Sequence, residues 1–188
     1  MRIVAGRHRG RSLRTPDDLA VRPTADRTRE ALFNILMSGK LSEEGNKRLP
    51  GARVLDAFAG TGALGLEALS RGAAHAVFME NYAPAIEICR ANIAALGEGE
   101  RAELLACDVL HPRPAPAPCD IVFLDPPYNQ GFGEKAVNVL LKAGWIAPGT
   151  LVSVELMKHE PFETPPGFTE LDARSYGKAK LIFLKYEG

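Results

Sequence analysis

The stretch Val54-Leu55-Asp56-Ala57-Phe58-Ala59-Gly60-Thr61-Gly62-Ala63-Leu64-Gly65 passes from an apolar strand through a glycine turn into a helix. Its glycines at 60, 62 and 65 fit G-x-G-x-x-G, the spacing of nucleotide-binding turns. Glycines at these places permit a tight turn, close approach of the backbone to a ligand and packing of the helix on the strand. After this stretch apolar strand segments alternate with helical segments. The alternation predicts an α/β fold, a doubly wound and mostly parallel sheet covered by helices.

The pattern divides the chain into an N-terminal extension, residues 1–50, and a core domain, residues 51–188. The extension is expected to contain a small β-hairpin of strands 2–5 and 12–15, then a helix that ends at Met37 and is capped by Thr24 or Asp26. The core is expected to contain strands at 53–58, 75–80, 103–107, 119–124, 151–156, 169–175 and 180–186, and helices at 63–71, 84–96 and 134–143. In such a sheet ligands bind beyond the carboxyl ends of the strands.

Three acidic residues at predicted strand ends are candidate cofactor ligands: Asp56, Glu80 and Asp108. Glu80 comes about 20 residues after the glycine turn, where an acid binds ribose hydroxyls in dinucleotide sites. Asp56 would repel a pyrophosphate but attract the ammonium group of a methionine moiety, which favours S-adenosylmethionine over NAD. Asp108 is expected to accept a hydrogen bond from an adenine amino group, or else to cap a turn.

The tetrapeptide Asp125-Pro126-Pro127-Tyr128 follows the apolar run 121–124 and suits a flat base that carries an exocyclic amine. Such an amine is a poor nucleophile because its lone pair is delocalised into the ring, and acceptors on its N–H groups can draw that lone pair back. Asp125 and the Pro126 carbonyl are the candidate acceptors, and the Tyr128 ring can stack on the base, a contact worth about 1–3 kcal/mol. The alternative is a buried strand that ends in a proline turn.

The net charge is zero, from 23 basic and 23 acidic residues, but arginines concentrate at the start of the chain. They are Arg2, Arg7, Arg9, Arg11, Arg14, Arg22, Arg27 and Arg29. Arginine favours bidentate contacts to phosphate and stacking on unpaired bases. The cluster therefore predicts a polyanionic partner, and Arg7, Arg9, Arg11, Arg22 and Arg27 are the candidate nucleic-acid ligands.

Other features set the general class of the protein. The three cysteines, Cys89, Cys107 and Cys119, have neither a paired count nor metal-ligand spacing, so we expect reduced thiols and no metal site. No apolar run approaches the roughly 18 residues that span a membrane. These features predict a soluble, cytoplasmic protein.

The chain also resembles a known family. The run from Asp56 to Gly72, followed by Glu80, Asp108 and the tetrapeptide at 125–128, is similar to class I S-adenosylmethionine-dependent methyltransferases. A more specific likeness, over nearly the whole chain, is to the bacterial RsmD-type ribosomal RNA guanine-N2 methyltransferases. It is carried by Arg2-Ile3-Val4-Ala5-Gly6, Arg22-Pro23-Thr24, Arg27-Thr28-Arg29-Glu30-Ala31-Leu32-Phe33-Asn34 and Tyr176-Gly177-Lys178.

The resemblance implies a seven-stranded Rossmann-like sheet and methyl transfer to the N2 atom of guanine 966 in 16S ribosomal RNA. It implies that Phe58, Asn81 and Val109 join the cofactor ligands Asp56, Gly60, Gly62, Glu80 and Asp108, and that Lys178 contacts RNA. It further implies a monomeric enzyme whose substrate is an assembled or assembling 30S particle.

Three alternatives remain open at this point. A DNA adenine-N6 or protein glutamine methyltransferase would use the same tetrapeptide, but the arginine-rich start and the lack of a separate DNA-recognition domain oppose it. A non-enzymatic RNA-binding assembly factor would keep the fold without binding the cofactor. An NAD oxidoreductase is disfavoured by Asp56.

Overall fold

The computed structural model describes residues 1–16, 23–41, 45 and 48–188. Its helices are α1 (Pro23–Met37), α2 (Ala63–Ser70), α3 (Ala83–Leu96) and α4 (Phe132–Lys142). Its strands are β1 (Arg53–Ala57), β2 (His75–Glu80), β3 (Ala102–Ala106), β4 (Ile121–Leu124), β5 (Leu151–Met157), β6 (Phe168–Tyr176) and β7 (Ala179–Tyr186). The predicted core elements are therefore present, with small shifts at their ends. Among the described residues, no helix is long and apolar enough to cross a membrane.

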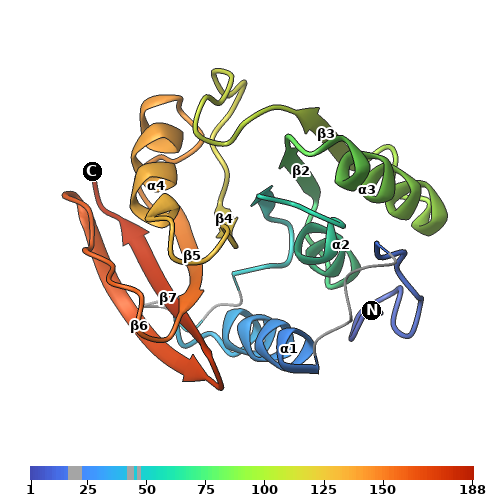
Figure 1. Cartoon of the computed structure of the whole chain (residues 1–188), viewed down its shortest axis with the longest axis horizontal. Coiled ribbons are helices and arrows are strands. Elements are labelled where there is room, and N and C mark those ends of the chain that lie inside the picture. Colours follow the sequence, from blue (N-terminus) through green and yellow to red (C-terminus); the bar gives the residue numbers. More distant parts are fainter. Residues whose placement is uncertain (17–22, 42–44, 46–47) are drawn as a thin grey trace.

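The strands form one sheet in the order β3-β2-β1-β4-β5-β7-β6. The first five in this order run parallel, and β7 pairs antiparallel with both β5 and β6. Figure 1 shows the β6–β7 hairpin at the opposite side of the molecule from β3 and α3. The prediction of a doubly wound, mostly parallel seven-stranded sheet is confirmed.

Helices cover both faces of the sheet because alternate strand residues point to opposite sides. One apolar core joins α1, α2 and α3 to strand residues such as Val54, Phe78 and Phe123. The other joins α4 and Trp145 to the intervening strand residues, such as Leu55 and Val122. Both faces of the central strands are thus buried, as expected for parallel strands.

The strand order reverses between β1 and β4. From β1 the chain builds outward through β2 and β3, then returns to place β4 on the other side of β1. Ala57 at the end of β1 lies beside Leu124 at the end of β4. Loops that leave two such strands diverge, so ligands of doubly wound sheets bind at this switch point.

Two glycines of the turn between β1 and α2 have separate physical roles. Gly62 has φ of 80°, in the left-handed region that glycine adopts at no steric cost, and it precedes the first residue of α2. A Cβ atom at Gly65 would come within 2.3 Å of the Phe78 ring. Gly65 therefore lets α2 pack directly on β2.

The N-terminal segment, residues 1–16, differs from the predicted hairpin. Its antiparallel pairing is a single bridge between Arg2 and Ser12. Strands do not extend from this bridge because backbone N–H groups bond to side chains of the core instead. Val4 and Ala5 donate to the two carboxylate oxygens of Glu67 at 2.8 and 3.0 Å. Arg14 donates to the Asn92 side chain at 2.7 Å.

The helix α1 also begins earlier than predicted. It starts at Pro23, so Thr24 and Asp26 lie within its first turn and neither is the residue that precedes the helix. Proline suits this first position because its fixed φ is helical and its missing N–H has no acceptor there. Buried residues of this helix and of the N-terminal segment, including Leu32, Phe33 and Ile3, belong to the core of the sheet. The division into two domains stays a prediction.

Glu67 is the anchor of the N-terminal segment, which gives a testable consequence. Its fully buried carboxylate accepts from Val4, Ala5 and the Arg71 guanidinium. We expect Glu67→Ala to lower the free energy of unfolding by about 3–5 kcal/mol, because it leaves these donors buried without an acceptor. Urea unfolding measures this change. The control Glu87→Ala breaks an exposed pair with Arg90 and should cost less than about 1 kcal/mol; equal losses in the two variants would contradict the anchoring role.

Candidate active site

A pocket opens at the carboxyl ends of β1 and β4, the switch point of the sheet. Its volume is about 590 Å³, including solvent at its mouth. It is lined by the glycine turn, the start of α2, two strand-end acids and residues from three other elements: Met1, Arg29, Asp56, Phe58, Ala59, Gly60, Thr61, Ala63, Leu64, Asp125 and Glu155. The pocket therefore combines the predicted cofactor turn with the first residue of the predicted catalytic tetrapeptide.

Asp56 lies at the base of this pocket and is almost fully buried. Its Oδ2 atom accepts a hydrogen bond from the Gly65 N–H at 2.8 Å. Burial, together with the nearby Glu80 charge, raises the pKa of Asp56 from 3.8 to about 7, although the Gly65 and Leu64 N–H groups oppose the rise. A carboxylate in this state gains stability from a cation placed beside it.

Glu80 holds the glycine turn against the end of β2. Its Oε2 accepts from the Gly60 N–H at 2.7 Å, and its Oε1 accepts from the N–H groups of Asn81 and Tyr82. Oε2 has a further lone pair that is open to a ribose hydroxyl, and this binding stays a prediction. Phe58, in the same turn, has φ of 64°, a conformation that costs a non-glycine residue free energy and concentrates at functional sites.

Asp108 follows β3 and caps the turn after it. Its oxygens accept from the Leu110 N–H and the His111 ring, both at 2.9 Å. These bonds lower the pKa of Asp108, the Leu110 N–H most, so the group is a carboxylate at neutral pH. Asp108 therefore caps a turn, which is the alternative role that the sequence predicted for it. Asn81 is exposed and Val109 is buried, and the contact of all three with cofactor stays a prediction.

The tetrapeptide leaves β4 at the pocket. Asp125 is an exposed residue that lines the pocket, and its carboxylate accepts no hydrogen bond from the described residues. The Pro126 carbonyl likewise has no donor among them. Tyr128 is half-buried, and its hydroxyl donates to Glu155 at 2.8 Å. The arrangement offers two acceptors with unused lone pairs beside a ring of fixed position.

Glu155 in the middle of β5 is the acid that faces Asp125 across the pocket. Enclosure by protein atoms raises the pKa of Glu155, while the Tyr128 hydroxyl and the Arg29 charge lower it. Crowding by protein atoms also raises the pKa of Asp125, and the charges of Glu155 and Asp56 raise it further. The pair holds a proton at higher pH than an ordinary carboxylate does.

The predicted nucleic-acid ligands fall into two groups. Arg7 bonds to Glu98, and Arg11 donates to the Ala95 carbonyl, so both hold the N-terminal segment on α3. Arg9 and Arg27 are exposed and line a separate pocket. Lys178 is exposed in the β6–β7 turn, and its carbonyl accepts from Lys158 just beyond β5, at the edge of the sheet where the active site lies. Arg22 lies outside the described residues.

Sequence reasoning did not select Arg29, Met1 or Glu155, which also line the pocket. Arg29 had a signal: it precedes Leu32 and Phe33 by three and four residues, so on a helix it shares their apolar face and points inward. It is 5% exposed, and its Nη2 donates to the Arg2 carbonyl at 2.9 Å. Met1 had none, because its place depends on how the N-terminal segment folds back over Thr61.

A protein-family model described as Conserved hypothetical protein 95 matches residues 1–185. The chain belongs to this family. Ribosomal RNA small subunit methyltransferase D of Haemophilus influenzae is 36% identical over 181 residues, which cover 94% of this chain and 89% of that protein. Its namesake in Escherichia coli K12 is 38% identical over 166 residues, 88% and 79% of the two chains. The solved structure of the E. coli protein yhhF matches with a TM-score of 0.83 at 34% identity, over 100% of this chain and 98% of that chain.

These matches confirm the RsmD-type resemblance and the methyltransferase fold. They also confirm that the chain is a methyltransferase enzyme. The family is thus consistent with the pocket, where the glycine turn and the first residue of the tetrapeptide meet. The individual roles of the lining residues stay predictions.

The buried acid Asp56 makes stability depend on pH. Its pKa in the folded protein, about 7, exceeds the ordinary value of 3.8. Between these values the folded protein binds the proton more tightly than the unfolded chain does, so stability falls as pH rises through this range. We expect Asp56→Asn to be more stable than the unchanged protein at pH 8, by up to about 4 kcal/mol, and equally stable near pH 4.

Urea unfolding from pH 4 to pH 8 measures this difference. The control Asp172→Asn, at a partly exposed position that pairs with Arg174, should show no such pH-dependent gain. Parallel stability curves for Asp56→Asn and the unchanged protein would contradict the raised pKa.

The charge of Glu155 gives a second prediction. We expect Glu155→Gln to lower the pKa of Asp125, because it removes the neighbouring negative charge while its amide oxygen can still accept from Tyr128. The carboxyl carbon shift of Asp125, followed by NMR against pH, measures this. The control Glu170→Gln, at an exposed position on β6, should leave the pKa of Asp125 unchanged. If Asp125 has the same pKa in Glu155→Gln as in Glu170→Gln, the coupling between Glu155 and Asp125 is refuted.

Proposed function

We propose that this enzyme transfers a methyl group from S-adenosylmethionine to the N2 atom of a guanine in small-subunit ribosomal RNA, guanine 966 of 16S RNA. We further propose that it acts as a monomer in the cytoplasm on an assembled or assembling 30S particle. The single observation that carries the proposal is that Asp125 and Asp56 line one pocket at the switch point of the sheet. The names of the relatives from H. influenzae and E. coli support the choice of ribosomal RNA.

The pocket residues fit S-adenosylmethionine. Asp56 offers a carboxylate for the methionine ammonium group, and its pKa, raised by burial and by the Glu80 charge, would fall again beside a bound cation. Gly60 has open space where a Cβ would stand, which lets a ligand approach the backbone of the turn. Glu80 and Asp108 follow the next two strands, where the ribose and adenine would lie. When bound, this cofactor supplies an electrophilic methyl group.

The residues of the tetrapeptide would prepare the amine. The Asp125 carboxylate and the Pro126 carbonyl would accept from the two N–H groups, which orients the nitrogen lone pair toward the methyl group. Tyr128, held by Glu155 at 2.8 Å, would carry the base on its ring. Positioning of this kind can lower a barrier by about 7–11 kcal/mol. The cofactor would supply the methyl group to the amine nitrogen, and Asp125 or water would take the amine proton.

The enzyme can reach its target base only where that base lies outside an RNA double helix. A guanine in a paired RNA stem cannot bring its N2 atom into a pocket about 590 Å³ in volume, so the target lies in a loop or is flipped out. The exposed cations nearby, Arg9, Arg27 and Lys178, would hold the flanking backbone. Such contacts make binding weaken as salt concentration rises.

Methyl transfer from labelled S-adenosylmethionine tests the proposal. The substrates are 30S subunits that lack the modification, naked 16S RNA, duplex DNA and a protein extract, and the products are analysed as nucleosides and amino acids. We expect N2-methylguanosine at position 966 of the subunit RNA. Label in DNA adenine or protein glutamine would replace the proposal with that activity, and cofactor binding without any label would contradict it.

Asp125 is the residue whose change should matter most. We expect Asp125→Ala to reduce kcat by 100-fold or more, in the range of general-base and positioning losses, while binding of cofactor and RNA changes little. The matched control Asp120→Ala lies at the opposite edge of the sheet, before β4, and should keep kcat near that of the unchanged enzyme. Full turnover in Asp125→Ala would remove this residue from the mechanism.

A further inference from the structure

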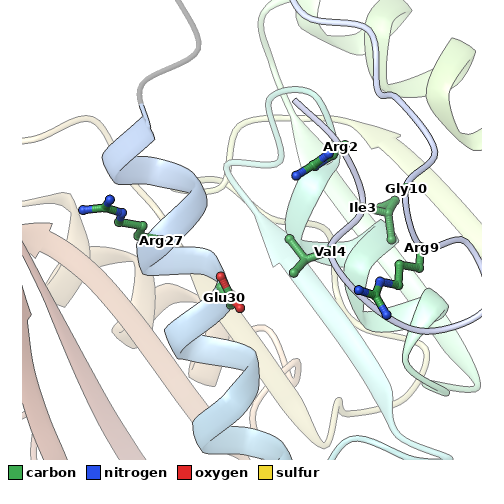
Figure 2. A pocket seen from close by; sticks show the side chains of 7 residues that line it. All are labelled: Arg2, Ile3, Val4, Arg9, Gly10, Arg27 and Glu30. Carbon is green, nitrogen blue, oxygen red and sulfur yellow. The ribbon is translucent and has the colours of Figure 1, made fainter.

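A second pocket lies between the N-terminal segment and α1. It measures about 780 Å³, including solvent at its mouth, and is lined by Arg2, Ile3, Val4, Arg9, Gly10, Arg27 and Glu30. Figure 2 shows Arg2 and Arg9 extending from the N-terminal segment toward α1, where Glu30 faces them. Arg27 stands one turn earlier on the helix, with its guanidinium directed away from that segment. Three cations and one anion leave the lining positively charged.

This pocket adjoins the active site through one shared contact. The Arg29 side chain donates to the Arg2 carbonyl at 2.9 Å and joins α1 to the N-terminal segment. On the segment, Met1 lines the active site and Arg2 lines the second pocket. On α1, Arg29 lines the active site and Glu30 lines the second pocket. The two pockets are therefore adjacent along both the N-terminal segment and α1.

The arginines of this pocket differ from those that hold the segment in place. Within the described ranges, no side-chain hydrogen bond or ion pair is formed by Arg2, Arg9 or Arg27. By contrast, Arg7 is committed to Glu98, and Arg11 to the Ala95 carbonyl. These guanidinium groups line one pocket and have no acceptor in the described part of the chain, so they can bind an anion there. The fork of N–H donors on each guanidinium matches the geometry of a phosphate.

We propose that this second pocket binds a phosphodiester of the RNA strand next to the target guanine, with Arg2 and Arg9 as its ligands. The inference rests on the proposed function and deepens it, since it says where the substrate backbone lies. Arg27 contacts the strand at the outer rim. Glu30 is the one anionic lining group, and it weakens the binding of a phosphate.

Arg2 and Arg9 contact no base in this arrangement, so they add affinity and register without reading sequence. Their loss should raise the KM for the RNA substrate and leave kcat nearly unchanged. It should also reduce the salt dependence of binding. Each phosphate contact contributes about −0.7 to the slope of log K against log salt for single strands, so two lost contacts change the slope by about 1.4.

The test measures binding of 30S subunits and naked 16S RNA at several KCl concentrations, together with methyl transfer and cofactor binding. We expect the double variant Arg2→Ala, Arg9→Ala to bind RNA at least about tenfold more weakly, with the flatter salt slope and unchanged cofactor affinity. Glu30→Gln should bind RNA more tightly, because it removes the repulsive charge. The control is Arg113→Ala, which removes an exposed arginine of the connection between β3 and β4 that does not line the second pocket and should bind as the unchanged protein does.

Each result bears on a separate claim. If the unchanged protein methylates no ribosomal RNA, the proposed function fails and the inference fails with it. If it methylates ribosomal RNA but the double variant keeps the affinity and salt slope of Arg113→Ala, only the phosphate site is refuted. Binding by Glu30→Gln that is no tighter than that of the unchanged protein would also overturn the site, since the bound negative charge would then lie elsewhere.

Discussion

The hydrogen bond from the Gly65 N–H to the buried Asp56 carboxylate is the constraint on which the active-site end of the molecule depends. The bond joins the end of β1 to the first turn of α2. The two elements can approach this closely only because Gly65 has no side chain, since a Cβ atom there would meet the Phe78 ring. The glycine turn between these elements is then held from its other side by Glu80. Two carboxylates that bond to backbone N–H groups thus fix the turn on which the proposed cofactor rests.

Burial of the Asp56 carboxylate costs free energy, and the hydrogen bonds of the folded protein do not fully offset this cost. The pKa, raised to about 7, shows that the folded protein holds this proton up to a much higher pH than the unfolded chain does. A bound cation would remove this penalty, so the stability lost at Asp56 becomes affinity for a ligand with an ammonium group. The same reasoning applies to Asp125 and Glu155, whose mutual repulsion favours a ligand that donates hydrogen bonds between them.

The N-terminal segment links the two pockets physically. Glu67 and Glu98, both buried, bind its backbone and its arginines, so a segment without regular strands still has a defined position. That position places Met1 at the active site and Arg2 and Arg9 at the second pocket. Any change that loosens the segment should therefore affect cofactor and RNA together. Arginine is used in both capacities here, as a structural ligand of buried carboxylates and as a free cation.

The sequence by itself determined the fold class, the order of the core elements and the acids at the strand ends. These depend on local patterns: alternating apolar segments, the glycine spacing at 60, 62 and 65, and the prolines after β4. It placed Asp56 and Asp125 at the same edge because parallel strands share a carboxyl end. Only the tertiary structure decided which arginines are free. Arg7 and Arg9 look alike in the sequence, but one faces buried Glu98, 91 residues away, and the other faces a pocket. Contacts between residues so far apart in the chain are set by how the segment packs on α2 and α3, and no local pattern encodes them.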